Sequence, residues 1–372
     1  MIDHLLHRLA TGNVARRAAA AGALARALID GEFACAERCA AEAALTALLD
    51  DPSPKVRLAL ADALSLSRQA PIHLIDALAS DQPEVAALVL GRSPLLGEAD
   101  LVARVASGRA STQRLIAGRP NLSCAVAAAL AEVADADACL ALLANPSAEI
   151  SPSGFRRMAD RLGHIGAARK ALAADPRLPP DCRHTLIVKL GGALASAPLV
   201  AASLGPAGAE RAVLSASVAA VLMLIGDTPA DLLASLADHL GRAGVLTAEI
   251  LVRVVAAGQV DFFGAALVSL TGQSSRRVQS LLARGGDVAV AALLGQAGLT
   301  GPAERAMLEA LKLWREVDAG RRLAGSQEVS RLLIARLGEQ DRGSEIAELL
   351  TGLHRAAVRE NALGHGRALA AA

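Results

Sequence analysis

Aromatic residues are almost missing from this chain of 372 residues. Only 1% of its residues are aromatic, with no Tyr, one Trp and four Phe, although 53% of the residues are hydrophobic. Ala, Leu and Val must therefore fill the core. That composition suits closely packed helices and suits sandwiches or barrels badly, because those folds draw on β-branched and aromatic side chains. Single-stranded nucleic acid is also a poor fit, since its binding proteins stack bases on aromatic rings.

Signatures of catalysis and cofactor binding are missing as well. The sequence has no Gly-x-x-x-x-Gly-Lys phosphate loop, no Gly-x-Ser-x-Gly elbow and no His-Glu-x-x-His helix. Two close pairs, His4 with His7 and Cys35 with Cys39, fall short of the three or four ligands that a zinc site needs. We expect no metal and no cofactor. An active site assembled from distant residues would leave no such motif and stays open.

Cysteine is scarce, and its number is odd. The five cysteines lie at positions 35, 39, 124, 139 and 182. A scattered, odd set in a large chain favours reduced thiols and a cytoplasmic protein. We interpret Cys35 and Cys39 as small core residues. The first residues, MIDHLLHRLA, lack the basic and long apolar stretches of a signal peptide.

Long apolar runs are few. The longest extends over residues 212–226, between Arg211 and Asp227. It is shorter than the ~20 residues that a helix needs to cross a bilayer. We therefore expect a buried core helix here and no membrane span.

The stretch DDPSPKVRLALADALSLSRQA, residues 50–70, indicates what the chain does contain. Its two prolines end one helix, because proline lacks an N–H donor and disfavours helix in the residue before it. Ser53 is the expected N-cap of the next helix, with Pro54 at its first position. Val56 and Leu60 then begin an apolar stripe at helical spacing. A helix this short must bury its stripe on a neighbour to be stable.

Junctions of this type recur along the first half of the chain. The spacing from Asp51 to Asp81 is 30 residues, and the spacing from Asn145 to Asp175 is again 30. Self-similarity at this period predicts stacked two-helix units. The predicted junctions are Leu48–Pro52, Leu78–Pro83, Gly118–Asn121, Leu142–Pro146 and Leu172–Pro176.

Residues 51–57, Asp-Pro-Ser-Pro-Lys-Val-Arg, resemble a HEAT-like repeat, in which an Asp-Pro turn precedes a helix that carries Val-Arg. The resemblance covers roughly residues 40–195 and implies an all-α fold, a HEAT-like α-solenoid of stacked helical hairpins. Ala86 and Ser151 stand where later repeats would carry the arginine, so we expect no ladder of arginines along the array.

A change of character follows the repeats. The glycines at 191 and 192 and the segment 198–208 mark a boundary. We therefore divide the chain into a HEAT-like helical repeat array at residues 1–195 and a C-terminal helical domain at residues 196–372.

The segment DFFGAALVSLTGQSSRRVQSLLARGGDVAVAALLGQAGL, residues 261–299, carries a second resemblance. Its Phe-Phe pair, its Arg-Val-x-x-Leu-Leu helix and its Gly-Gly-Asp turn resemble an uncharacterised bacterial domain-of-unknown-function family. Members of that family join HEAT-like helices to a C-terminal helical region. The resemblance implies an all-helical architecture and assigns no catalytic residue.

Basic residues are concentrated in one part of the chain. Residues 151–200 hold eight basic and three acidic residues, although the net charge of the whole chain is only +1. If these basic side chains share a face, they would attract an acidic helix, a phosphorylated partner or nucleic acid. An ordinary solvated face is the plainer interpretation, because acidic residues are interspersed. The candidate binding residues are Arg156, Arg157, Arg161, Arg169, Lys170, Arg183 and Lys189.

These patterns favour a cytoplasmic protein–protein interaction scaffold or regulatory adaptor without catalysis, because stacked hairpins expose a long surface. One alternative is nucleic-acid binding through residues 156–189, although a duplex binder would usually carry more net charge. Another is an enzyme or small-ligand binder with a pocket between the two regions. The partner's identity is not encoded in any motif, and self-association through an Ala-rich face is compatible with the sequence.

Overall fold

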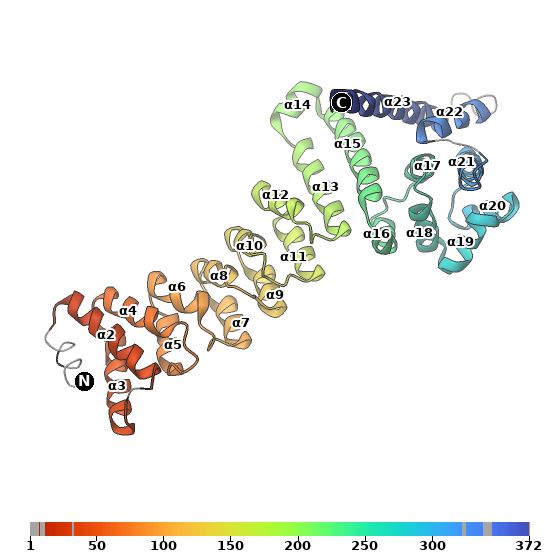
Figure 1. The fold of residues 1–372 in the computed structure, drawn as a ribbon. Coiled ribbons are helices and arrows are strands. Elements are labelled where there is room, and N and C mark those ends of the chain that lie inside the picture. The colour runs from red at the N-terminus through yellow and green to blue at the C-terminus, as the bar shows by residue number, and fades with distance from the viewer. Residues whose placement is uncertain (1–6, 8–11, 32, 322–324, 338–343, 372) are drawn as a thin grey trace. The chain divides into compact units, whose positions relative to one another are not determined.

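The computed structural model describes residues 7, 12–31, 33–321, 325–337 and 344–371 (Figure 1). These residues form 22 α-helices and two short 3₁₀ turns, and they contain no β-strand. The predicted all-α class is therefore confirmed. Helix is the expected outcome for a chain so rich in Ala and Leu, which have the highest intrinsic preference for it.

The chain folds as two compact units, Met1–Pro179 and Pro180–Ala372. Residues 180–195, which the sequence analysis assigned to the first region, form the helix α13 (Pro180–Ala195), and this helix packs along α15 (Pro206–Asp227) within the second unit. The boundary at residue 195 stays a sequence-based interpretation.

The first unit consists of short helices, most of them eight to thirteen residues long. They are α2 (Val14–Ile29), α3 (Cys35–Ala47), α4 (Pro54–Leu64), α5 (Ile72–Ala79), α6 (Pro83–Arg92), α7 (Glu98–Ser107), α8 (Ala110–Ala117), α9 (Cys124–Val133), α10 (Ala136–Leu143), α11 (Pro152–Leu162) and α12 (Gly166–Ala174), with the 3₁₀ turn η1 (Leu48–Asp50) after α3.

Within this unit, helices contact the helix two places further along the chain. α2 packs on α4, α4 on α6, α6 on α8, α8 on α10 and α10 on α12, and a second row runs from α7 to α9 and α11. Fully buried small and branched residues such as Ala21, Leu60 and Val89 fill the space between the rows. Each helix thus buries its apolar stripe on its neighbours, as its short length requires. The HEAT-like interpretation of this pattern remains an interpretation.

Proline marks the starts of several helices, as predicted from the junctions. Pro54, Pro83 and Pro152 begin α4, α6 and α11, where the missing N–H has no helical partner to lose. Ser53 is the N-cap of α4, as predicted, but its hydroxyl makes no capping bond. The Asp51 carboxylate instead accepts a hydrogen bond from the Ser53 N–H, at 2.8 Å.

The second unit begins with the α13–α15 hairpin and ends with a long helix. Its elements are α13, α14 (Pro198–Leu204), α15, the 3₁₀ turn η2 (Ala230–Leu232), α16 (Leu233–Arg242), α17 (Ala248–Ala256), α18 (Val260–Thr271), α19 (Ser275–Arg284), α20 (Asp287–Gln296), α21 (Pro302–Asp318), α22 (Ser326–Leu337) and α23 (Glu345–Ala371).

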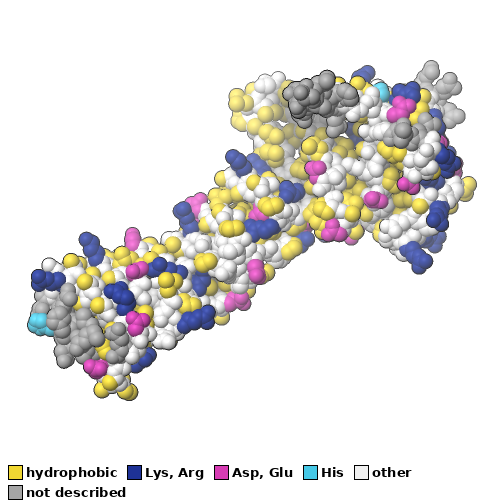
Figure 2. All heavy atoms as spheres, viewed as in Figure 1, with side chains coloured by type: hydrophobic (Ala, Val, Ile, Leu, Met, Phe, Trp, Pro, Cys, Tyr) yellow, Lys and Arg dark blue, Asp and Glu magenta, His cyan; other side chains and the backbone are white. Residues whose placement is uncertain are grey.

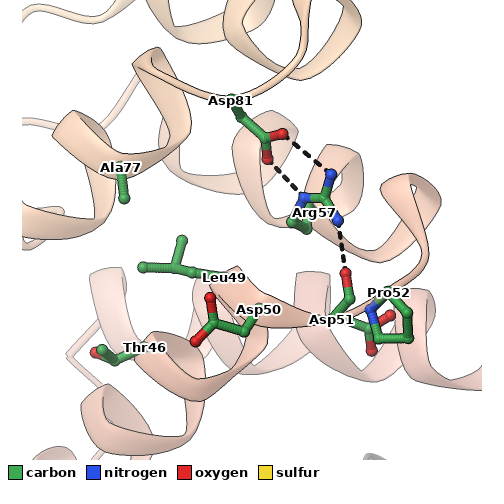
Figure 3. A pocket seen from close by; sticks show the side chains of 8 residues that line it. All are labelled: Thr46, Leu49, Asp50, Asp51, Pro52, Arg57, Ala77 and Asp81. Atoms are coloured by element: carbon green, nitrogen blue, oxygen red, sulfur yellow. Dashed lines mark hydrogen bonds and ion pairs between the residues drawn. The ribbon is translucent and has the colours of Figure 1, made fainter.

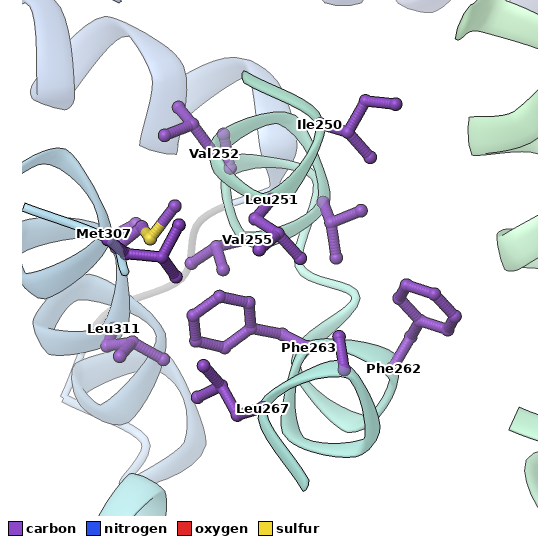
Figure 4. Packing of buried hydrophobic residues seen from close by; sticks show 14 of the residues in the cluster. Ile250, Leu251, Val252, Val255, Phe262, Phe263, Leu267, Met307 and Leu311 are labelled. Carbon is purple, nitrogen blue, oxygen red and sulfur yellow. The ribbon is translucent and has the colours of Figure 1, made fainter. Parts of the chain in front are cut away.

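The core of the second unit forms around α17 and α18 (Figure 4). Phe262 and Phe263 at the start of α18 are buried, and Phe263 lies among aliphatic side chains of α17 and α21. Trp314 on α21 packs against this cluster and donates a hydrogen bond from its indole Nε1 to the carbonyl oxygen of Val255, at 2.7 Å. Most of the few aromatic rings of the chain are thus concentrated here.

The prediction of a buried core helix at residues 212–226 is wrong. These residues lie in α15, where only Ala209, Val221, Leu224 and Ile225 are buried. Among the described residues, α15 alone is a single helix long and apolar enough to cross a membrane. α13 and α14, joined at a 65° bend, meet the same criterion as a pair. α14 has no buried residue, and Figure 2 shows hydrophobic side chains gathered over it.

Candidate functional site

The junction before α4 is held by the carboxylate that the sequence pattern places there. Besides accepting the N–H of Ser53, Asp51 accepts two hydrogen bonds from the guanidinium of Arg17 on α2, at 2.9 and 3.1 Å. The pair is partly buried, and its two parallel bonds fix the geometry of both side chains. Asp51 therefore joins its own turn to the preceding helix pair.

The next junction repeats this arrangement one hairpin later (Figure 3). Arg57 on α4 donates two hydrogen bonds to the carboxylate of Asp81, at 2.6 and 3.0 Å, and a third to the backbone carbonyl of Asp51, at 2.6 Å. Asp81 also accepts the N–H of Gln82 in its own turn. One guanidinium thus bridges two successive junctions.

Asn145 and Asp175 stand at the corresponding position of two later junctions, but they make different hydrogen bonds. The buried amide of Asn145 donates to the carbonyl oxygens of Ala117 and Arg119, at 3.0 and 2.7 Å, in the junction predicted at residues 118–121. Asp175 is held by Arg177, which also donates to the carbonyl of Ala148. The period of thirty residues is therefore the spacing of side chains that tie each junction to the one before it.

Both paired carboxylates of the first junctions stay ionised. The hydrogen bond from Arg17 lowers the pKa of Asp51 below its usual value, although burial opposes that effect. Burial likewise raises the pKa of Asp81, but the hydrogen bonds from Arg57 and from the backbone of Gln82 outweigh it, and the net shift is downward. A general acid or base works best with a pKa near the operating pH. These two carboxylates are therefore built for structure and unsuited to proton transfer.

A surface groove of about 560 Å³ lies beside these ion pairs, and we refer to it as the junction groove (Figure 3). Its apolar part comes from Leu49 in η1, from Pro52 and from Ala77 in the C-terminal half of α5, and its polar part comes mostly from the junction residues. The carboxylate of Asp50 is exposed in it. The lining residues are Thr46, Leu49, Asp50, Asp51, Pro52, Arg57, Ala77 and Asp81.

Three of the predicted basic binding residues lie on α11. Arg156 and Arg157 are exposed, and Arg157 forms an ion pair with Glu132 at 2.7 Å. Arg161 is half-buried and donates to the carbonyl oxygens of Ala131 and Ala134, at 2.6 and 2.8 Å. The guanidinium of Arg161 therefore caps the C-terminal end of α9.

The other four predicted residues are divided between α12 and α13. Arg169 donates to the carbonyl of Gly163 at 3.0 Å, while Lys170 beside it is exposed. Arg183 and Lys189 belong to α13 in the second unit, where both are half-buried. The structure thus brings five of the seven predicted residues onto two neighbouring helices and places two in the other unit.

Arginines at other positions make the inter-hairpin contacts that the sequence analysis missed. Arg119 donates to the carbonyls of Leu90 and Ser93, and Arg161 and Arg177 reach carbonyls earlier in the chain in the same way. These arginines do not occupy the ladder position of a HEAT-like repeat, where Ala86 and Ser151 stand. In the second unit, Arg315 donates to three carbonyls at the end of α19. The fork of the guanidinium suits this role, and only four of the 38 basic residues are lysines. This excess of arginine over lysine is the sequence feature from which such contacts could have been predicted.

Metal ligands do not gather in the described part of the chain, which holds no group of three or more His, Cys, Asp or Glu side chains placed to bind an ion. His4 lies outside the described residues. Cys35 and Cys39 are exposed, so their interpretation as core residues is wrong, and Cys139 and Cys182 are the buried cysteines. Burial raises the pKa of the Cys139 thiol to about 11, which keeps it protonated and unreactive near neutral pH.

Two histidines meet in the second unit. The Nδ1 atom of His184 on α13 lies 3.0 Å from the Nε2 atom of His239 on α16. Burial, and to a smaller degree the neighbouring His239, lowers the pKa of His184 to about 4. His184 is therefore neutral near pH 7, and one of the two rings donates to the other. No sequence motif links the two histidines, because 55 residues separate them.

Short helices in successive contact, junctions tied by arginine and aspartate, and a groove beside them define an all-α protein. The chain belongs to a family of uncharacterised proteins conserved in bacteria (DUF2336), whose sequence profile matches residues 85–346. The segment 261–299, which carried the predicted resemblance, lies inside that range, so the prediction is confirmed. No curated protein and no solved structure matches the chain.

Proposed function

We propose that this chain is a non-catalytic protein-interaction scaffold or adaptor, and that the junction groove binds a segment of a partner protein. The strongest support is that two of the three carboxylates that line the groove are paired with arginines and the third is exposed. Asp51 and Asp81 are already paired with Arg17 and Arg57. Only Asp50 presents an exposed carboxylate in the groove, which suits recognition of a side chain and offers no pair of groups for acid–base chemistry.

The chemistry of the groove defines the kind of segment that it fits. Leu49, Pro52 and Ala77 offer an apolar surface next to Asp50. A lysine or arginine flanked by small apolar residues would place its charge on the carboxylate and its stem on the apolar part. Phosphate groups would meet acidic side chains here, so nucleic acid is a poor ligand for this groove. The groove precedes the residues matched by the family profile and is a property of this chain's own first hairpins.

The basic side chains of α11 and α12 support a binding surface less well. Arg161 and Arg169 donate to carbonyl groups of their own chain, and Arg157 is paired with Glu132. Arginines that are already bonded within their own chain attract a phosphate backbone less strongly. We therefore place the partner in the junction groove. We also propose that the protein is cytoplasmic, because an odd, scattered set of five cysteines in a large chain favours reduced thiols.

A matched pair of charge reversals tests the proposal. Asp50→Lys reverses the one exposed carboxylate of the groove, and Glu149→Lys reverses an exposed carboxylate in the loop before α11. Affinity-tagged wild type and variants are expressed in the native cells, and bound proteins are quantified by mass spectrometry. We expect Asp50→Lys to lower recovery of a specific protein about tenfold, the loss that corresponds to ~1.4 kcal/mol, and Glu149→Lys to leave it unchanged. Equal recovery with both variants would contradict the proposal.

A further inference from the structure

The α13–α15 hairpin carries apolar side chains that are exposed in the described part of the chain. Leu199 and Leu204 on α14 are 82% and 53% exposed, and Leu214 and Met223 on α15 are 67% and 69% exposed. From residue 190 to residue 226 the sequence has only two charged residues, Glu210 and Arg211. A helix that is apolar all round is normally covered on all sides, and contiguous exposed apolar surface marks a binding site.

The line of contact between α13 and α15 passes through Gly191. A Cβ atom at this position would lie 3.1 Å from the Cγ1 atom of Val213 and 3.2 Å from the Oγ atom of Ser217. A Cβ atom there would make an unusually tight contact, so glycine favours the close approach of the two helices. The contact also fixes which residues lie on each flank of the hairpin, because every residue of an α-helix turns by about 100°.

One flank of the hairpin is apolar from its tip almost to its base. At helical spacing, Leu190 and Leu194 lie on the same side of Gly191, and both are exposed, by 43% and 44%. On α15 the same flank carries four exposed residues at spacings of four, three and four. They are Ala212, Ala216, Ala219 and Met223.

The charged positions of this flank lie at its base. By the same spacing they are Arg183 on α13 and Asp227 on α15, one of each sign. The flank therefore carries no net charge and does not repel a second copy of itself. Its three alanines let another helix approach closely, and the leucines and Met223 supply the area that is buried.

We infer that this flank of the α13–α15 hairpin, the hairpin flank, is the interface through which two copies of the chain form a symmetric dimer. A twofold axis would place the two hairpins against each other as a four-helix bundle. α13 and α15 have 16 and 22 residues, so they are about 24 and 33 Å long, and two helices side by side are roughly 20 Å wide. A face of these dimensions covers roughly 480–660 Å² on each copy, so two copies together bury on the order of the ~1,000 Å² that a specific interface requires.

A lipid bilayer fits the same surface less well. Insertion of the hairpin would also carry Lys189, half-way along α13, and Glu210 and Arg211, near the tip, into hydrocarbon, where charges are costly, although none of the three lies on the flank itself. Residues 180–227 contain no Trp, Tyr or Phe, the side chains that usually anchor a protein at the membrane surface.

Sedimentation velocity of the purified full chain tests this inference. Concentrations of roughly 1–100 µM cover dissociation constants in the micromolar range. We expect a species of twice the 37.8 kDa mass of the chain. Leu194→Glu and Met223→Glu should each shift it toward the monomer by at least about tenfold in dissociation constant, because each would bury an unpaired charge. Val288→Glu is the matched control, since Val288 is 86% exposed on α20, outside the flank.

A third flank variant, which adds no charge, and a test of lipid binding make the outcome decisive. Ala216→Leu adds no charge and preserves helix preference, but its bulk should separate the two copies and weaken the dimer. Circular dichroism melting verifies that each variant is folded. A wild type that stays monomeric, or a dimer that all three flank variants leave intact, would overturn the inference. So would a monomer that binds vesicles of phosphatidylglycerol and phosphatidylethanolamine and loses that binding on Met223→Glu.

Discussion

Many guanidinium groups in the described part of the chain bind to the chain itself. Arg17 and Arg57 pair with the junction carboxylates, and Arg119, Arg161 and Arg315 donate to backbone carbonyls at the ends of earlier helices. The last carbonyls of a helix have no partner within it. A forked cation supplied from the next hairpin satisfies them and fixes the packing of the two hairpins at once.

Two arginines one turn apart on α11 distinguish a structural from a surface role. Arg161→Gln removes both hydrogen bonds to the end of α9 and should lower the free energy of unfolding by about 1–2 kcal/mol, because buried acceptors lose their donor. Arg157→Gln removes only an exposed ion pair with Glu132 and should change it by less than about 1 kcal/mol. Urea unfolding followed by circular dichroism measures both. An equal loss of unfolding free energy in the two variants would contradict a structural role for Arg161.

The His184–His239 pair predicts how stability depends on pH. The folded pKa of His184 is about 4, whereas an unfolded histidine has a pKa near ~6.5. Between these values the unfolded chain binds more protons, so stability falls as the pH drops from ~6.5 toward 4. The loss should reach about 1–2 kcal/mol by pH 5. Thermal melting at pH 7.5, 6 and 5, intervals that span the expected window, should show a flatter profile for His184→Gln. An identical profile in the variant would rule out this cause.

At the scale of the element, turns and helix ends explain much of the fold. Aspartate and proline at the junctions set where α4 and α6 begin, and those positions were predictable because their chemistry is local. Gly258 depends on tertiary contact instead. It follows α17 with a φ of +84°, and a Cβ there would lie 2.8 Å from the Cζ2 atom of Trp314.

Two glycine substitutions separate the cost of a positive φ from the cost of a clash with Trp314. Gly258→Ala should lose about 2–3 kcal/mol of unfolding free energy from the positive φ and the clash with Trp314 together. Gly272→Ala, at the end of α18, has a φ of +67° with open space around it, so it should lose only about 1 kcal/mol. Because Trp314 is the one tryptophan of the chain, its fluorescence should shift in the first variant only. Equal losses would show that the contact contributes nothing.

At the scale of the whole molecule, composition and period predicted the fold class, and burial was the property they predicted least well. The scarcity of aromatic residues indicated an all-α chain correctly, and the recurrence of Asp51, Asp81, Asn145 and Asp175 marked positions that lie between helices. Residues 212–226 looked like core because apolar composition does not reveal which surface covers a helix. The junction groove was also invisible, since its lining comes from residues 46–81 and depends on which carboxylates the arginines occupy.

The most direct test of an interaction scaffold is a photo-reactive amino acid placed in the groove in living cells. Thr46 is exposed and lines the groove, whereas Glu149 is exposed in a loop away from its lining residues. Irradiation of cells that carry the probe at position 46 should produce a discrete adduct with another protein. The adduct should be absent with the probe at position 149, and Asp50→Lys should abolish it. No protein adduct at position 46, or the same adducts at both positions, would contradict the claim that this chain acts by binding a partner in its junction groove.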